Sequence, residues 1–139
     1  VFTTGKVNVG TQLTANVEHT MSVMYGVTAD ATVTSLEIAA GVTELTITDN
    51  TTVHFEATIV GRNNLGTKHC SYKISGVIDK TGGNASLVNT VTETIIAETD
   101  ESWIGQVTTT GNNLAVQVTG EAATNIRWVA FVKTTSISF

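Results

Sequence analysis

Stiff, β-branched side chains dominate this chain and set the strongest limit on how it can fold. Of its 139 residues, 27 are threonine, 18 are valine and 10 are isoleucine, and none is proline. The second heavy atom on Cβ restricts χ1 and packs well on a pleated surface, which favours extended backbone. Threonine suits a wet sheet face, since its hydroxyl meets water while its methyl contacts a cross-strand neighbour. The composition therefore predicts an all-β domain and indicates no chemistry by itself.

Apolar and polar residues alternate with a period of two along several segments, as expected for strands with one buried face. The clearest of these segments are 53–60, 72–78 and 114–119. Residues 79–84 and 111–113 have the Gly- and Asn-rich composition of hairpin loops. We count eight or nine strands and little helix, at spacings typical of an antiparallel β-sandwich or a jelly roll.

The two ends of the chain differ from these regular segments. The last stretch, Ile126 to Ser138, is apolar on both faces, so we expect a strand that is central to the sandwich or pressed against another subunit. Residues 1–35 have few apolar positions and could form an edge strand or an arm that orders against neighbouring chains. We therefore divide the chain into an N-terminal strand or arm (1–35), with an intersubunit role as one alternative, and a β-sandwich domain (36–139).

The charge and the cysteine count exclude several classes of partner. The formal net charge of −5 argues against binding to a nucleic-acid backbone. No apolar run approaches the length needed to cross a membrane, so we expect no membrane insertion. The single cysteine, Cys70, permits no internal disulfide. The chain starts at Val1 without a signal-peptide pattern, and we favour a piece of a longer protein.

Residues that could perform chemistry are sparse. The three histidines and the cysteine have no spacing typical of a metal site. The best enzymatic motif is Glu98, Asp100 and Glu101 just before Trp103, since a glycosidase uses two acids beside an aromatic platform. Acids this close in sequence normally share one exposed loop, however, and no Gly-x-Ser-x-Gly elbow is present. We therefore predict a non-enzymatic protein that uses no cofactor and no metal ion.

Short blocks of sequence from Phe55 onward follow one another in an order found in a known family. The most distinctive block runs from Gly120-Glu121 to Ala130. The earlier blocks are Phe55-Glu56-Ala57 with Val60-Gly61-Arg62, Tyr72 to Gly76, Ala97 to Trp103, and Leu114 to Glu121. Together they cover roughly 85 residues, and they resemble a β-domain of tail-fibre and other surface structural proteins of tailed bacteriophages. The first 50 residues match no family that we can name.

This resemblance implies an assembly, a location and a set of structural residues. The chain would be exposed on the virion surface, assembled in the cytoplasm of the bacterial host and bound to other virion proteins. It would form a homotrimer, an expectation that rests also on the C-terminal strand with two apolar faces. Its core anchors would be large aromatic side chains, namely Trp103, Trp128, Phe55 and Tyr72. Arg62 and Arg127 stand in otherwise apolar strands, so we expect each to pair with a carboxylate. The candidate partners are Glu56, Glu98 and Glu121.

Several roles remain open at this point. A tail-fibre or spike tip would bind a host glycan or protein receptor, whereas a capsid decoration or fibre protein would bind the capsid. The alternative from another class is a carbohydrate-binding module, which requires exposed aromatic rings aligned on one face. The rings that decide this are Trp103, Tyr25 and Tyr72. An enzyme would instead require Glu98 or Glu101 to face another acid across a cleft.

Overall fold

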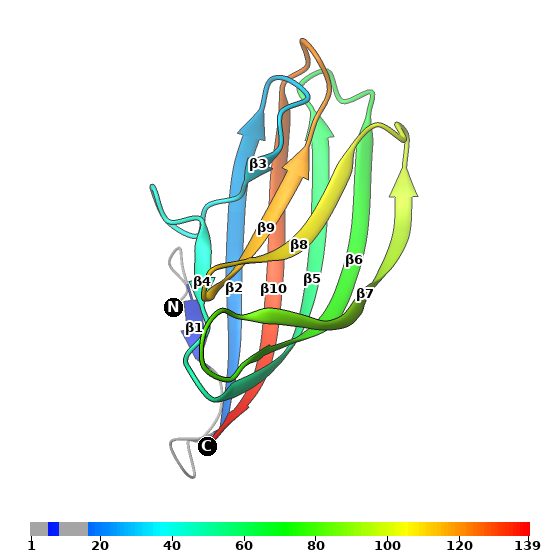
Figure 1. Ribbon diagram of the computed structural model, residues 1–139. Coiled ribbons are helices and arrows are strands. Elements are labelled where there is room, and N and C mark those ends of the chain that lie inside the picture. The colour runs from blue at the N-terminus through cyan, green and yellow to red at the C-terminus, as the bar shows by residue number, and fades with distance from the viewer. Residues whose placement is uncertain (1–5, 9–16) are drawn as a thin grey trace.

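Antiparallel strands account for nearly all regular structure in the computed structural model, which describes residues 6–8 and 17–139 (Figure 1). The strands are β1 (Lys6–Asn8), β2 (Val17–Thr28), β3 (Thr34–Ser35), β4 (Glu44–Thr46), β5 (Thr51–Asn63), β6 (His69–Lys80), β7 (Ser86–Glu98), β8 (Ile104–Thr110), β9 (Asn113–Thr119) and β10 (Ile126–Ser138). Within the described residues there is no helix, and so none long and apolar enough to cross a membrane. The prediction of an all-β antiparallel sandwich is confirmed.

Two sheets of unequal size face each other. The larger sheet has the order β1-β2-β10-β5-β6-β7. The smaller sheet is built around β9, with β8 on one side and the short β3 and β4 on the other. Figure 1 shows β8 and β9 crossing in front of the larger sheet. The connections 64–68 and 120–125 lie at the upper end in this view, whereas the C-terminus lies at the lower end.

β10 is one of the two central strands of the larger sheet, between β2 and β5. Its inward side chains are buried, but the outward Val129 is 43% exposed and Phe131 is half-buried. The strand is therefore central, as expected, but only one of its faces is covered within this chain. The physical reason is that the smaller sheet packs on one side of the larger sheet, and nothing among the described residues covers the other.

β2 pairs with β10 over its whole length, from Val17 to Thr28. Residues 17–28 are thus a strand of the larger sheet, but not its edge, because β1 pairs with β2 on the other side. The division of the chain at residue 35 stays a prediction. Residues 1–5 and 9–16 lie outside the described residues, and an intersubunit role for this segment stays a prediction.

Four aromatic side chains fill the space between the sheets. Phe55, Tyr72, Trp103 and Trp128 are all buried. The rings of Trp103 and Trp128 meet at 58°, with their centroids 5.6 Å apart, a tilted arrangement that aromatic pairs prefer. Tyr72 Oη donates to the carbonyl oxygen of Trp103 (2.9 Å), and Trp128 Nε1 donates to Thr28 Oγ1 (2.9 Å). The polar groups of Tyr72 and Trp128 therefore each have a partner, as buried polar groups require.

Two glycines allow this close packing. Gly61 lies opposite Trp128 on the neighbouring strand, and a Cβ placed there would come within 2.7 Å of the indole ring. Gly105, on β8, sits against Tyr72, where a Cβ would be 2.8 Å from the ring. Both distances are far below van der Waals contact, so the missing side chains determine how closely the aromatic rings approach the backbone.

We expect Gly61→Ala to lower the free energy of unfolding by about 1–3 kcal/mol, because the added methyl overpacks a rigid ring. Gly26→Ala is the matched control: its Cβ would meet the end of the more adaptable Leu36 side chain at 2.9 Å, so its cost should be smaller. Urea unfolding of both variants and the wild type measures the difference. An equal or smaller loss for Gly61→Ala would contradict this account.

Candidate functional site

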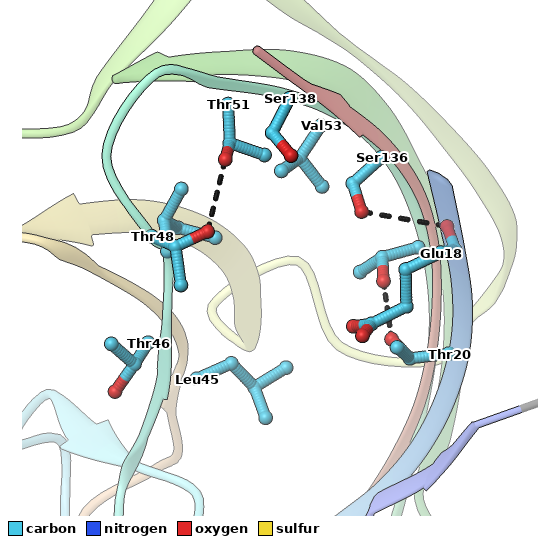
Figure 2. A pocket seen from close by; sticks show the side chains of 11 residues that line it. Glu18, Thr20, Leu45, Thr46, Thr48, Thr51, Val53, Ser136 and Ser138 are labelled. Carbon is cyan, nitrogen blue, oxygen red and sulfur yellow. Dashed lines mark hydrogen bonds between the residues drawn. The ribbon is translucent and has the colours of Figure 1, made fainter. Parts of the chain in front are cut away.

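The lower end of the sandwich contains a hollow of about 170 Å³ lined mostly by hydroxyl groups (Figure 2). Its hydroxyl-bearing lining residues are Thr20, Thr46, Thr48, Thr51, Thr134, Ser136 and Ser138. The hydroxyls of Thr20 and Thr134 are hydrogen-bonded to each other, and those of Thr48 and Thr51 lie 2.9 Å apart. No aromatic ring is among the described lining residues. Because hydroxyl groups of its wall bond to one another, we interpret this hollow as a polar end of the core.

At the upper end, Lys68 joins three connections of the fold. Its Nζ lies 2.6 Å from Asp100 Oδ2 and 2.7 Å from Glu121 Oε1. Trp103 Nε1 donates to Glu121 Oε2 at 3.1 Å, which links this group to the aromatic core. Lys68 ends the β5–β6 connection, Asp100 lies between β7 and β8, and Glu121 lies between β9 and β10. We call these four residues the Lys68 cluster.

The electrostatics of the Lys68 cluster favour its charged form. Hydrogen bonds from Lys68, supported by Ser102, hold the pKa of Asp100 well below its ordinary value. Lys68 and Trp103 lower the pKa of Glu121 in the same way. Asp100 and Glu121 in turn raise the pKa of Lys68. Carboxylates that stay ionised and paired at neutral pH suit a structural clamp better than proton transfer.

The only two arginines in the sequence lie directly opposite each other on the outer face of the larger sheet. Arg62 is on β5 and Arg127 is on β10, and both are exposed. Among the described residues, neither arginine makes an ion pair or a side-chain hydrogen bond.

The carboxylates expected to pair with these arginines either bind a lysine or line another hollow. Glu121 binds Lys68, because both lie in connections at the end of the sandwich. Glu56 is 3.7 Å from Lys133, its cross-strand neighbour. Glu98 lines a different hollow, near Tyr72. The expected pairing of Arg62 and Arg127 with these acids is therefore not formed in the described part of the chain.

A hollow of about 680 Å³ lies beside the two arginines. Its lining residues are Val27, Arg62, Asn63, Asn64, Asn125 and Arg127. The backbone N–H of Asn64 donates to the carbonyl oxygen of Asn125 (3.0 Å), so two connections are joined at its rim. We call this the arginine hollow.

Carboxylates gather at another hollow, beside β7 and β8. Glu93, Glu98 and Glu101 line it together with Tyr72, Ile95, Trp103 and Ile104. Two of the three acids in the sequence motif thus share one hollow, whereas Asp100 points to Lys68. We call this the acidic hollow.

The aromatic rings do not form an aligned platform. Trp103 and Tyr72 are buried, and only Tyr25 of the three is exposed, at 43%. The requirement stated for a carbohydrate-binding module with a row of stacked rings is therefore not met by these residues.

The described residues provide neither a group of metal ligands nor an activated thiol. They contain no group of three or more His, Cys, Asp or Glu side chains that could hold a metal ion. The Cys70 thiol is buried, and burial raises its pKa, which disfavours the thiolate needed for nucleophilic attack.

Comparison with known proteins identifies a fold. No protein-family model matches the chain, and neither does any curated protein. Among solved structures, tailspike protein gp49 of Acinetobacter baumannii bacteriophage Fri1, described as a capsular polysaccharide depolymerase, matches with a TM-score of 0.53 and 8% identity. The match covers 96% of this chain and 21% of that chain. This chain has a phage tailspike-like β fold.

A second match is the tailspike protein of Acinetobacter baumannii phage AM24. It has a TM-score of 0.38 and 11% identity, and covers 87% of this chain and 26% of that one.

The prediction of a non-enzymatic protein is contradicted, because the tailspike that shares the fold is a depolymerase, an enzyme. The prediction required a catalytic pair to be recognisable within this chain. The chain spans only 21% of that tailspike, so a region of this size can lack such a pattern and still belong to an enzyme.

The sequence motifs missed the role of Lys68. Its two carboxylate partners are 32 and 53 residues away, and no local pattern connects them. The sequence contains only an indirect sign of this cluster. Asp100 and Glu121 both follow predicted strands, so they lie in connections, and a sandwich can bring such connections together at one of its ends.

We expect acid to weaken the Lys68 cluster. The pKa values of Asp100 and Glu121 lie below their ordinary values of 3.8 and 4.5, so the stability they contribute is present above those values and is lost as the pH falls through the lower, folded-state values. Glu121→Gln should therefore lower the melting temperature at neutral pH, and its difference from the wild type should narrow below about pH 4. Thermal unfolding across this range measures the effect.

Glu101→Gln is the control for this experiment, because it removes a neighbouring charge that does not contact Lys68. Its effect on the melting temperature at neutral pH should be small. A Glu121→Gln difference that stays constant from neutral to acid pH would refute the linkage.

Proposed function

We propose that this chain is a β-sandwich domain of a bacteriophage tailspike that engages bacterial capsular polysaccharide on the virion surface. The observation that carries the proposal is the fold shared along nearly the whole chain with a capsular polysaccharide depolymerase. The same observation favours a tail location over capsid decoration. Since the chain spans about a fifth of that enzyme, the activity of the whole protein and its other virion partners are part of the proposal.

The surface of the domain suits a polysaccharide. Of the hollows described above, the arginine hollow combines charged groups with amides, and the acidic hollow combines them with exposed apolar side chains. The exposed polar groups are largely hydroxyls and amides, which both donate and accept hydrogen bonds as sugar hydroxyls do. Only 14% of the residues are charged, so few of these hydroxyls and amides are covered by ion pairs.

A homotrimer forms part of the proposal. β7 pairs with β6 alone among the described strands, so its other edge offers unpaired backbone groups. Ile95 and Ile96 on this strand are 57% and 61% exposed. An open edge with exposed isoleucines is a suitable surface for contact between copies of the chain.

We expect light scattering to give a mass three times the 14.6 kDa of one chain. Ile96→Lys should reduce this mass to that of a monomer, because it places a charge on the β7 edge. Leu65→Lys is the control, since it changes an exposed apolar residue on a distant connection and should leave the mass unchanged. A monomeric wild-type chain would remove the homotrimer from the proposal.

Cleavage of the polysaccharide within this chain is a second candidate, favoured by the acidic hollow. Glycoside hydrolysis uses two carboxyl groups, one as general acid and one as base or nucleophile, and Glu98 and Glu101 line the same hollow. The exposed Ile104 beside them offers an apolar surface for a sugar ring.

We expect the chain to bind capsular polysaccharide of its host bacterium and, under the second candidate, to release reducing ends from it. Glu98→Gln or Glu101→Gln should then lower the cleavage rate by about 100-fold or more while binding persists. Glu44→Gln, outside the acidic hollow, is the control. Unchanged cleavage by both variants would exclude this hollow, and the absence of binding would overturn the main proposal.

A further inference from the structure

We propose that Arg62 and Arg127 form a subsite for the anionic group, a carboxylate or a phosphate, of an acidic sugar unit. This inference deepens the proposed function, on which it rests, by naming the class of saccharide that the arginine hollow would take. Four features of the chain lead to it.

The placement of the two arginines is unfavourable unless an anion joins them. Like charges directly opposite each other on neighbouring strands destabilise a sheet. The sequence contains twelve acidic residues, yet no described carboxylate pairs with Arg62 or Arg127. The lysines, in contrast, find partners nearby: Lys68 and Lys80 each contact an aspartate. An external anion would offset the repulsion between the two guanidinium groups.

The guanidinium of Arg62 lies against the adjacent connection. A Cβ at Gly66 would lie 2.6 Å from Arg62 Nη2, so the guanidinium rests directly against the backbone of this glycine. Gly66 also has a φ of +70°, a conformation that disfavours other residues. A planar, positioned guanidinium can bind a carboxylate or phosphate through two parallel hydrogen bonds.

The hollow beside the arginines has the size and the polar groups for a sugar. Its volume of about 680 Å³ falls within the range of small-molecule sites. The side chains of Asn64 and Asn125 line it and make no side-chain hydrogen bond to another described residue. Their amides can therefore donate to and accept from sugar hydroxyls.

An apolar row lies next to the arginines on the same outer face. The strand register places Tyr25, Val129 and Val60 side by side across β2, β10 and β5. All three are more than 40% exposed. Tyr25 on β2 is the diagonal cross-strand neighbour of Arg127 on β10, a separation of about 7–8 Å, so a sugar ring lying on Tyr25 can present its anionic group to Arg127.

These features favour an acidic saccharide over an acidic protein segment. A protein partner that neutralised two arginines would need no hollow lined by free amides beside them. The combination of a charged pair, unpaired amides and one exposed tyrosine matches the three parts of a sugar acid: its anion, its hydroxyls and its apolar ring face.

The test uses the side-chain Nε–Hε signals of an isotope-labelled chain, because the sequence contains only two arginines and each gives one signal. Arg62→Lys assigns them. Titration with glucuronate should shift both signals, as should glucose 1-phosphate if the subsite accepts phosphate as well as carboxylate. Glucose should shift neither, and acetate should act only at concentrations at least about tenfold higher.

Each other outcome overturns the proposal or part of it. Equal responses to acetate and glucuronate would reduce the subsite to a general anion site and remove the sugar. Signals that move with none of the anions would refute it entirely. A response to glucose 1-phosphate and not to glucuronate would identify phosphate as the recognised group.

Binding of capsular polysaccharide separates this inference from the proposed function. Arg62→Gln and Arg127→Gln should each weaken binding of an acidic polysaccharide by about tenfold, whereas Lys133→Gln, which removes one charge from the same face of β10, should not. Binding that survives both arginine substitutions would refute the subsite and leave the proposed function standing. If the arginine signals respond to glucuronate but the chain binds no capsular polysaccharide, the subsite stands and the proposed function is refuted.

Discussion

The contact between Trp103 and Trp128 is the interaction on which the rest of this fold depends. It is the point where the connection before β8 meets a central strand of the larger sheet, and it brings the smaller sheet against the larger one. Glycines at positions 61 and 105 allow the backbone to approach these rings and Tyr72. Because the large aromatic surface is buried here, the two sheets are fixed relative to each other at the upper end of the sandwich.

This contact also positions the surfaces proposed to bind ligands. Trp103 donates to Glu121, Glu121 binds Lys68, and Lys68 closes the connection that follows Arg62. The acidic hollow uses the same tryptophan as part of its wall. Core packing, the charged clamp and the two upper hollows are therefore one continuous structure, in which the polar groups are held by an apolar anchor.

Much of the fold could be predicted from the sequence, because most strands alternate apolar and polar residues around clear turns. β5 and β6 follow this pattern, and Gly111-Asn112 connects β8 to β9 as expected. β2 was harder to recognise, since Thr20 and Ser22 occupy buried positions where an apolar residue would have signalled a strand. A hydroxyl at an inward position cannot be distinguished from one at an outward position by composition.

The candidate site was less predictable than the fold. Arg62 and Arg127 stood out as charges in apolar strands, but their direct opposition depends on strand pairing between segments more than 60 residues apart. Lys68 likewise pairs with Glu121 only because the fold brings three connections together at one end of the sandwich. Long-range pairing of this kind follows from topology, which a single sequence does not specify.

The Lys68 cluster gives the arginine hollow a dependence on acidity that its own groups lack. Guanidinium groups keep their charge throughout the biological pH range. The amides of the hollow belong to the connections that Lys68 and Glu121 hold together, with Asn64 on one and Asn125 on the other. Protonation of Glu121 would loosen both connections at once. The arginine hollow has no titrating group of its own, yet its shape would thus depend on the protonation state of a carboxylate outside it.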